Sequence, residues 1–320
     1  MLNIINKYSE YIFIFYNYLQ DLILEEEKMK KVTKAVIPAA GLGTRVLPAT
    51  KAQPKEMLVI VDKPSLQYIV EELVESGITD IVIVTGRNKN SIEDHFDFSY
   101  ELENTLKKEN KTGLLEKVEK LSSMANIFYV RQNHPLGLGH AILKAKPFIG
   151  DEPFVIALGD DIVYNPERPV AKQLIENYEK YGVSIVGCQE VALEDVSKYG
   201  VVKPTENLDE NTVAISDFVE KPSKEEAPSR LACLGRYLLD GKIFNYLEET
   251  KAGKGGEIQL TDAILKMLQD GEKVVAYEFQ GKRYDIGNKF GLLKANIEFG
   301  LKNDETKEEL KNYLKTLKLD

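Results

Sequence analysis

Short apolar runs alternate with amphipathic segments over most of the chain. Four runs have the continuous, β-branched character of strands buried on both faces, at residues 36–40, 81–85, 154–158 and 183–187. After the first run, apolar side chains recur at helical spacing from Leu66 to Val74, and Gly77 is predicted to end this helix. A second helix is predicted from Pro169 to about Gly182. This alternation predicts an α/β fold: a Rossmann-like, doubly wound, mostly parallel mixed sheet with helices on both faces.

The second half of the chain predicts a mixed edge of the same sheet. Residues 199–203 and 213–219 form hairpin-like strands on either side of a turn-forming stretch, 205–211. The later predicted elements are a helix from Thr261 to about Gln269, a strand at 273–279, a helix at 288–300 and a terminal helix within 304–320. The sequence contains no internal repeat and no low-complexity linker, so residues 29–320 are expected to form one domain. Its C-terminal helix is expected to pack on its own subunit or on a neighbour.

The first 28 residues differ from the remainder. The run from Tyr11 to Leu19 is aromatic and aliphatic, but Asn17 and then Gln20 interrupt it before the about 20 apolar residues that a membrane span needs. No small-x-small cleavage site follows. Residues 25–28 must be encoded almost entirely by purines, as a bacterial ribosome-binding site is, and Met29 resembles a natural start. We therefore expect residues 1–28 to be an N-terminal extension outside the core; a marginal surface helix is the alternative.

The composition excludes several classes of protein. The chain has 320 residues, of which 43% are hydrophobic and 29% charged, as in an ordinary soluble globular protein. Its net charge of -9 argues against a nucleic-acid surface but allows a small nucleotide in a locally basic pocket. Cys188 and Cys233 are far apart and lack a CxxC partner, so neither a disulfide framework nor a zinc site is predicted. We expect a cytoplasmic protein without nucleic-acid or membrane partners.

The loop Gly41-Leu-Gly-Thr-Arg45 gives the first sign of chemistry. Its glycines allow close backbone approach to a ligand, and the arginine, Lys51 and Lys55 put three cations on a stretch that Pro48 and Pro54 stiffen. Cations beside bare N–H groups suit a triphosphate, although an ordinary solvated loop would have the same composition. A dinucleotide fingerprint is excluded because the prolines lie where its helix would run and the third glycine is missing. A P-loop is excluded because no GK[ST] follows.

The segment from Ala39 to Leu58, AAGLGTRVLPATKAQPKEML, resembles the signature of the sugar nucleotidyltransferases, in the form typical of bacterial UTP–glucose-1-phosphate uridylyltransferases. Further segments match in the family's order: Arg131–His140, Leu158–Asp161, Tyr199–Val202, Phe218–Pro222, Gly255–Asp262 and Tyr284–Gly287. The resemblance extends from about residue 30 to about residue 300. The related thymidylyltransferases share the first loop but typically lack the PKEM and GGEIQLTD motifs. The implied fold is of the nucleotide-diphospho-sugar transferase type.

The resemblance implies transfer of UMP from UTP to glucose 1-phosphate, giving UDP-glucose and pyrophosphate by metal-assisted in-line attack on the α-phosphate. Arg45 and Lys55 are expected to hold the triphosphate, and Lys221 the sugar phosphate. Asp160 and Asp285 each follow a predicted strand, where open α/β sheets bind ligands, and are expected to bind Mg²⁺. The alternative is that these aspartates only cap turns. His134 and His140 have no third ligand at metal spacing and are expected to be loop residues.

The resemblance also implies a set of substrate-binding residues: Ala39, Ala40, Gly41, Gly43, Thr44, Glu56, Gln132, Gly137, Gly200 and Glu220. Gln132 and Gly137 are expected at the uracil, where a carboxamide can match a donor and an acceptor. Glu220 is expected to accept hydrogen bonds from glucose hydroxyls, and Gly200 to let the backbone approach the sugar. A homo-oligomer is also implied. Another substrate pair, such as dTTP or a different hexose phosphate, is the enzymatic alternative, and a silent nucleotide-sensing subunit is a third.

Overall fold

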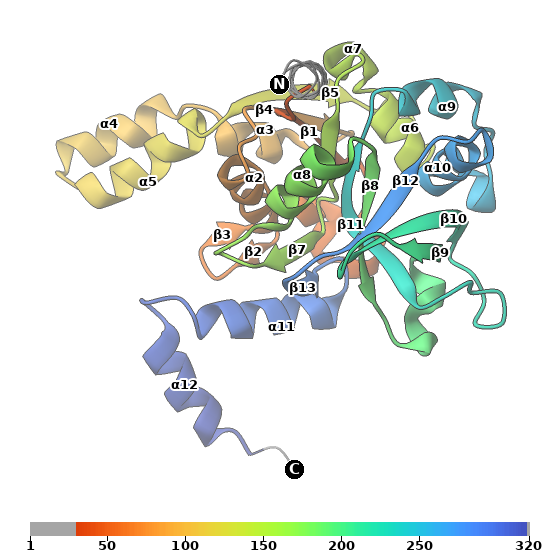
Figure 1. Cartoon of the computed structure of the whole chain (residues 1–320). Helices are drawn as coiled ribbons and strands as arrows, with labels where there is room; N and C mark the ends of the chain where they lie inside the picture. The colour runs from red at the N-terminus through yellow and green to blue at the C-terminus, as the bar shows by residue number, and fades with distance from the viewer. Residues whose placement is uncertain (1–29, 319–320) are drawn as a thin grey trace, which may run out of the picture. The chain divides into compact units, whose positions relative to one another are not determined.

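The computed structural model describes residues 30–318 (Figure 1). Residues from Val32 onward form one compact unit. The expected extension, residues 1–28, lies outside the described residues. In the described part of the chain, no helix combines the length and apolar character that crossing a membrane requires.

A nine-stranded mixed sheet is the largest sheet of the described residues. In spatial order its strands are β5 (Asn126–Arg131), β4 (Asp80–Thr85), β1 (Lys34–Ala39), β6 (Phe154–Ala157), β11 (Leu231–Leu239), β8 (Ser184–Glu190), β12 (Val274–Glu278), β10 (Thr212–Glu220) and β9 (Gly200–Asn207). Parallel pairing joins β5, β4, β1 and β6, and also β8 to β12. β11 is antiparallel to both β6 and β8, and β10 to both β9 and β12. The predicted α/β class is confirmed, but the parallel pairs are confined to these two groups.

Helices cover both faces of the sheet. α2 (Ser65–Glu75) packs on α8 (Val170–Tyr181), which contacts β8 and β11. α6 (Leu138–Leu143), α9 (Ile243–Glu249) and α10 (Leu260–Gln269) form the other layer, and α6 contacts β1. Val36 belongs to the same apolar cluster as Ile142 and Ile264 of this second layer, whereas the next residue, Ile37, points to the opposite face. These strands are apolar at nearly every position because both faces of the sheet are buried.

Smaller elements complete the described unit. The remaining helices are α3 (Asn90–Phe96), α4 (Tyr100–Lys108), α5 (Thr112–Ser123), α7 (Lys146–Ile149), α11 (Lys289–Gly300) and α12 (Lys307–Thr316). Two small antiparallel sheets pair β7 (Asp161–Tyr164) with β13 (Lys282–Asp285) and β2 (Val59–Ile60) with β3 (Lys63–Pro64). The 3₁₀ helices are η1 (Thr44–Val46), η2 (Ala49–Lys51), η3 (Lys55–Met57), η4 (Leu193–Lys198) and η5 (Lys254–Gly256).

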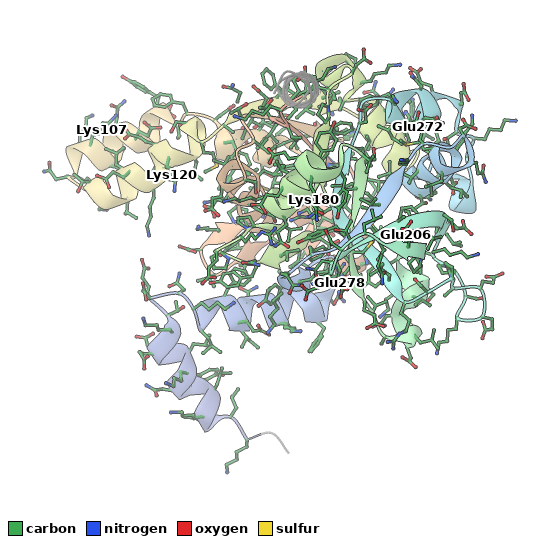
Figure 2. All side chains as sticks on the ribbon, viewed as in Figure 1. Lys107, Lys120, Lys180, Glu206, Glu272 and Glu278 are labelled. Carbon is green, nitrogen blue, oxygen red and sulfur yellow. The ribbon has the colours of Figure 1, made fainter. Side chains whose placement is uncertain are left out.

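Most predicted elements are present. The hairpin is β9–β10, and the predicted helices near 261–269 and 288–300 are α10 and α11. The terminal helix is α12, which contacts α11 and has no buried residue. Strands β5 and β11 of the large sheet were not predicted. Charged side chains such as Lys107, Lys120 and Glu206 are exposed at the surface (Figure 2), as is usual for these residue types.

Candidate active site

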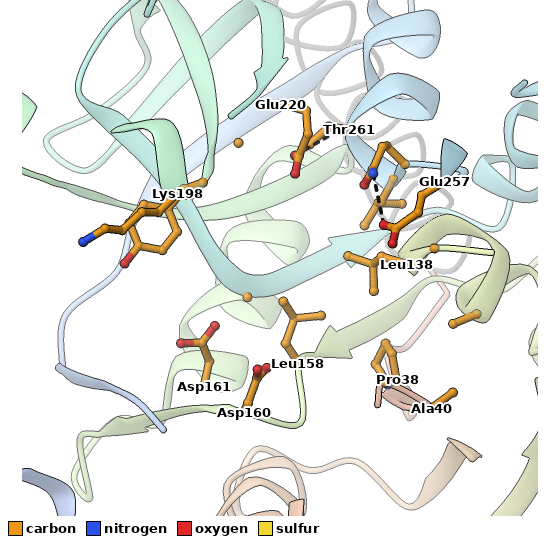
Figure 3. A pocket seen from close by; sticks show the side chains of 18 of the residues that line it. Pro38, Ala40, Leu138, Leu158, Asp160, Asp161, Lys198, Glu220, Glu257 and Thr261 are labelled. Atoms are coloured by element: carbon orange, nitrogen blue, oxygen red, sulfur yellow. Dashed lines mark hydrogen bonds between the residues drawn. The ribbon is translucent and has the colours of Figure 1, made fainter. Parts of the chain in front are cut away.

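A cleft of about 760 Å³ opens at the carboxyl ends of β1 and β6. The predicted site residues that line it are Ala40, Gly41, Gly43, Thr44, Arg45, Lys55, Gln132, Gly137, Asp160, Gly200, Glu220, Lys221 and Asp285. They come from segments that are up to about 240 residues apart in the chain. The loops after the parallel strands β1, β5 and β6 supply one part of the lining, because parallel strands end at one edge. The antiparallel hairpin β9–β10 and strand β13 supply the other part. Figure 3 shows Glu220 and Thr261 on one wall of the cleft, with Asp160 and Asp161 on another.

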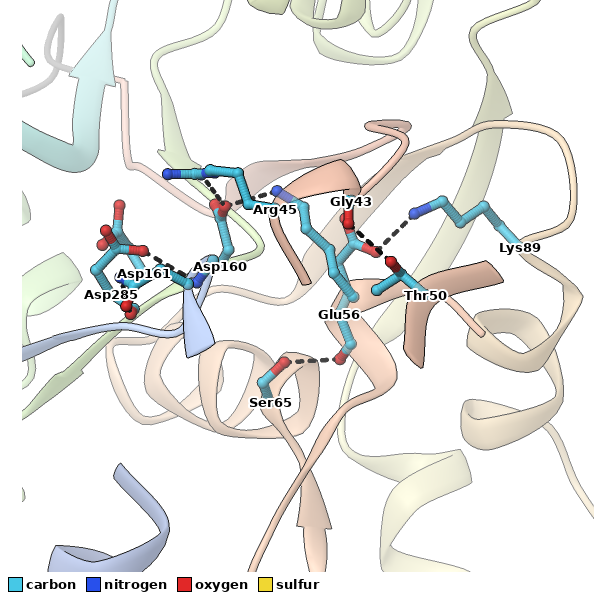
Figure 4. Close-up of polar contacts among 12 residues, drawn as sticks. Gly43, Arg45, Thr50, Glu56, Ser65, Lys89, Asp160, Asp161 and Asp285 are labelled. Atoms are coloured by element: carbon cyan, nitrogen blue, oxygen red, sulfur yellow. Dashed lines mark hydrogen bonds and ion pairs between the residues drawn. The ribbon is translucent and has the colours of Figure 1, made fainter. Parts of the chain in front are cut away.

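The glycine loop needs its second glycine. Gly43 has φ +66°, and a Cβ there would approach Thr50 and Lys55 to 3.1–3.3 Å. The hydroxyl of Thr50 donates a hydrogen bond to the Gly43 carbonyl at 2.7 Å, which ties the loop to the following turn. Arg45 and Lys55, which flank this turn, both donate to Asp160, and Figure 4 shows Arg45 beside that carboxylate.

Lys55 and Asp160 form a close ion pair in the cleft. Lys55 Nζ lies 2.6 Å from Asp160 Oδ2, and Arg45 Nη2 lies 3.4 Å from the same oxygen. Burial opposes ionisation of Asp160, but the Lys55 ammonium and the Arg45 guanidinium hold its pKa below the ordinary value. Burial also opposes the charge of Lys55, yet Asp160 and Glu56 raise the pKa of Lys55 above the ordinary value. Both groups are therefore charged at neutral pH.

Asp285 converges on the same point as Asp160. A Cβ on Gly287 would meet Asp160 Oδ2 at 2.6 Å, Arg45 Nη2 at 2.8 Å and Asp285 Oδ1 at 3.1 Å, so a glycine leaves this space open. The Gly287 N–H donates to Asp285 Oδ1 at 3.0 Å and holds the carboxylate there. Within residues 30–318, no group of three or more His, Cys, Asp or Glu side chains is placed to hold a metal ion. Asp160 and Asp285 are two carboxylates that meet at an open space, and such a donor set fits a divalent cation whose other ligands are phosphate and water.

The opposite wall of the cleft carries Glu220 and Lys221. Lys221 follows β10 with φ +47°, and its Nζ lies 2.9 Å from Glu220 Oε1. The Thr261 hydroxyl donates to Glu220 Oε2 at 3.2 Å. A Cβ on Gly200 would come within 2.7 Å of the Phe218 ring and 2.9 Å of Thr261, so only glycine fits between these side chains. This wall therefore offers a carboxylate and an ammonium side by side beside a bare backbone.

Gln132 and Gly137 form the third part of the lining. The Gln132 carboxamide donates from Nε2 to the Gly137 carbonyl at 3.1 Å. Gly137 has φ +104°, and a Cβ would lie 2.7 Å from both Glu257 Cβ and the Ile258 carbonyl. The segment 255–262 packs directly against this turn. The segment 131–140 and the segment 255–262 therefore build one wall of the cleft together.

Comparison with known proteins assigns the chain to a family, because a family model described as nucleotidyl transferase matches residues 34–300. The chain belongs to the nucleotidyl transferase family. A UTP–glucose-1-phosphate uridylyltransferase of Bacillus subtilis (strain 168) is 55% identical over 289 residues, which cover 90% of this chain and 98% of that relative. The resemblance seen in the sequence is confirmed.

Two solved structures resemble this nucleotidyl transferase closely. A crystal structure of a UDP-glucose pyrophosphorylase complexed with UDP-glucose is 48% identical, with a TM-score of 0.78 over 85% of this chain and 100% of the other. A UTP-bound enzyme of the same kind from Acinetobacter baumannii is 41% identical, with a TM-score of 0.83 over 90% and 100% of the two chains. These similarities support the α/β nucleotide-sugar transferase fold.

Two predicted site residues of the nucleotidyl transferase lie outside the cleft lining. Ala39 is fully buried at the end of β1. Glu56 is also fully buried and is ion-paired with Lys89, 2.7 Å from its Oε2. The carboxylate of Glu56 lies behind Lys55 and does not line the cleft, so a contact between Glu56 and substrate stays a prediction.

Sequence reasoning missed an acidic and basic pair in the lining of the nucleotidyl transferase. Arg283 Nη2 lies 2.5 Å from Asp161 Oδ1, and Arg283 Nη1 donates to the Tyr199 hydroxyl at 3.0 Å. Burial, together with Asp160 and Asp285, raises the pKa of Asp161 to about 6 against the opposing effect of Arg283. The available signal was adjacency, since Asp161 follows Asp160 and Arg283 is two residues before Asp285.

Proposed function

We propose that this nucleotidyl transferase transfers UMP from UTP to glucose 1-phosphate and releases UDP-glucose and pyrophosphate. The observation that carries the proposal is one cleft with the Lys55–Asp160 pair at one end and the Glu220–Lys221 pair at the other. One end suits a triphosphate and the other a sugar phosphate. The similar proteins named above act on these molecules or contain them.

The reaction brings two anions together. Two unit charges of the same sign about 4 Å apart repel by roughly 4 kcal/mol at an effective dielectric constant of about 20. Arg45 and Lys55 counter this repulsion on the triphosphate, and Lys221 does so on the phosphate of glucose 1-phosphate. Attack of that phosphate on the α-phosphorus then needs chiefly alignment and charge stabilisation, which fixed cations supply.

We propose Mg²⁺ as the metal, with Asp160 and Asp285 as its protein ligands. Magnesium retains several waters and accepts one or two carboxylates with phosphate oxygens, and the opening beside Gly287 has this character. When bound, the ion would neutralise part of the phosphate charge. Lys55, which contacts Asp160, would hold the phosphates beside it.

Substrate selection is assigned to the remaining lining. Ala40, Gly41, Gly43 and Thr44 present backbone to the nucleotide, and Gln132 with Gly137 recognises the uracil. The Gln132 carboxamide is held by the Gly137 carbonyl, so its orientation is set before a base binds. Glu220 accepts hydrogen bonds from glucose hydroxyls, while Gly200 leaves room for the sugar ring.

We further propose a Rossmann-like doubly wound sheet as the frame of this site, a catalytic domain within residues 29–320, a cytoplasmic location and a homo-oligomer. Phe290, Leu293 and Ile297 are exposed at helical spacing on α11 and support self-association. The mass in solution tests this part, and a monomer at micromolar concentration contradicts it. A chain starting at Met29 is expected to fold and turn over like the full chain; lost activity or solubility would place residues 1–28 in the core.

A panel of substrate pairs tests the function directly. Pyrophosphate release is measured for every pairing of UTP, dTTP, ATP, CTP and GTP with the 1-phosphates of glucose, galactose, mannose and N-acetylglucosamine. We expect the highest kcat/KM for UTP with glucose 1-phosphate. A better pair refutes the proposed substrates, and no release from any pair refutes catalysis.

A further inference from the structure

Glu56 and Lys89 form a buried ion pair behind the cleft. Their side chains are 0% and 7% exposed, and Lys89 Nζ lies 2.7 Å from Glu56 Oε2. Lys89 comes from the loop between β4 and α3, which is distant in sequence from η3. Figure 4 shows that Lys89 approaches Glu56 from the side away from Asp160. The pair therefore connects the turn that carries Lys55 to the body of the fold.

The pair is poorly explained as a device for stability. Glu56 Oε1 is buried and has no hydrogen-bond partner. The comparably buried pair Arg236–Glu72 differs, because both carboxylate oxygens of Glu72 accept from the guanidinium, at 3.0 and 2.7 Å. A buried pair with an unsatisfied oxygen gains little over an apolar pair of the same volume. A positional role accounts for it better.

Glu56 lies next to both charged groups of the phosphate end, which is the part of the cleft formed by Lys55 and Asp160. It follows Lys55 in η3, and its Cγ would lie 3.0 Å from a Cβ on Gly159, the residue before Asp160. The Ser65 hydroxyl donates to the Glu56 carbonyl at 2.8 Å and fixes the backbone of the same residue. A displaced Glu56 would thus move the attachment points of Lys55 and Asp160 relative to each other.

We propose that the Glu56–Lys89 ion pair is a positioning device that holds the η3 turn so that Lys55 and Asp160 meet in the cleft. The charge-assisted contact is the tether, and neither residue touches substrate. This inference rests on the proposed function for its kinetic consequence, but the tether itself is a property of the free protein. A 1 Å displacement of a charged group is enough to lower a transfer rate by about a hundredfold.

The test removes the tether without leaving a buried charge. Glu56→Gln alone strands the Lys89 ammonium and is expected to lower Tm, so its kinetics are ambiguous. The double variant Glu56→Gln/Lys89→Met has a neutral pair of similar volume and is expected to recover most of that Tm. Its kcat should stay at least tenfold below wild type, with KM for glucose 1-phosphate within threefold. Recovery of kcat together with Tm would show that the pair is only structural.

Amide hydrogen exchange gives a readout without substrate. The N–H groups of Met57 and Leu58 donate to Pro54 and Lys55 within the turn, at 3.0 and 3.2 Å. In the double variant these two amides should exchange at least tenfold faster than in wild type, although the Tm is mostly recovered. Unchanged exchange overturns the inference, whereas a wild-type protein that is inactive on UTP and glucose 1-phosphate overturns the proposed function alone.

Two controls complete the design. Lys89→Arg keeps a cation at the tether and is expected to recover most of the activity that Lys89→Met loses; equal losses would contradict the tether. Glu103 is a matched control, because it is 2% exposed and its Oε1 is also buried without a partner, but it lies on α4 and does not line the cleft. Glu103→Gln should leave kcat and the exchange of the η3 amides within twofold of wild type. A lower kcat or faster exchange of the η3 amides in this variant would show that loss of any buried glutamate has these effects.

Discussion

The two ends of the cleft hold their charged groups in different ways. At the phosphate end, Lys55 and Asp160 are 18% and 14% exposed and are 2.6 Å apart. At the sugar end, Lys221 is 47% exposed and contacts Glu220, which is 15% exposed, at 2.9 Å. A charge taken from water must be paired and supported, whereas an exposed one is stabilised by solvent and screened by salt. We therefore expect the buried Lys55–Asp160 pair to be the rigid part of the site, and the exposed Lys221 side chain at the sugar end to be the adaptable part.

The backbone differs less between the two ends than the side chains do. The phosphate end lies at the ends of β1 and β6, which pair in parallel in regular register. At the sugar end β9 and β10 also pair in regular register from Asp217 to Glu220, and β9 pairs with β11 as well at Gly200 and Val201. The contrast therefore rests on the exposure of Lys221, which follows β10 at positive φ. We therefore expect changes at the phosphate end to cost more than changes at the sugar end.

The largest effect is expected from removing either partner of the central ion pair. Lys55→Ala and Asp160→Ala should each lose on the order of 3 kcal/mol of transition-state stabilisation, roughly a hundredfold or more in rate. Added magnesium should partly restore Asp160→Ala, because the ion can still arrive with the triphosphate, and should not restore Lys55→Ala. Initial rates against magnesium concentration test both. Equal recovery, or losses of only a few-fold, would contradict the assigned roles.

A backbone change at the phosphate end should rank second. Gly43→Ala puts a Cβ at φ +66° and within 3.3 Å of Lys55. The left-handed strain costs about 1–2 kcal/mol, and displacement of Lys55 adds to it, so we expect kcat/KM for UTP to fall roughly thirtyfold. Gly77→Ala is the matched control, since Gly77 also has positive φ, lies outside the cleft lining and has no atom near its Cβ position. Similar kinetic losses in both variants would show that the effect is general strain.

A smaller effect is expected at the sugar end. Lys221→Ala should raise KM for glucose 1-phosphate about tenfold, with little change in KM for UTP, because its exposed ammonium is partly screened. The difference in this KM between Lys221→Ala and wild type should shrink as ionic strength rises from 50 to 300 mM. The loss of rate in Lys55→Ala should not depend on ionic strength in this way. Kinetics at the two salt concentrations measure this. A salt-independent loss would mean that Lys221 is buried by substrate and belongs to the rigid part.

The smallest effect concerns the hydroxyl that holds Glu220. Thr261→Val keeps the shape of the side chain and removes the donor 3.2 Å from Glu220 Oε2. A typical hydrogen bond contributes about 1 kcal/mol net, so KM for glucose 1-phosphate should rise about fivefold. Discrimination against galactose 1-phosphate should weaken by a similar factor. An effect as large as that of Lys55→Ala would contradict the division into a rigid and an adaptable end.

The sequence alone determined the parts of this protein that depend on local pattern. β1, β4 and β6 are recognisable because strands buried on both faces are apolar at every position, and α2 because its buried stripe recurs at helical spacing. The glycine loop is recognisable because its backbone conformation demands a specific residue type. Most of the predicted site residues line the cleft, because they were taken from the short sequence segments of the family signature.

Only the tertiary structure decided what depends on long-range pairing. Asp285 reaches Asp160 because β13 pairs with β7 in a register that places it opposite Asp161. Cys188 and Cys233 are distant in sequence but lie opposite each other on β8 and β11, both as free thiols. Glu56 has charged or polar neighbours on its N-terminal side and resembles an exposed turn residue, yet it is fully buried because Lys89 meets it from another loop. Periodicity and turn chemistry act over a few residues, whereas strand order and the burial of a charge depend on which distant segment supplies the partner.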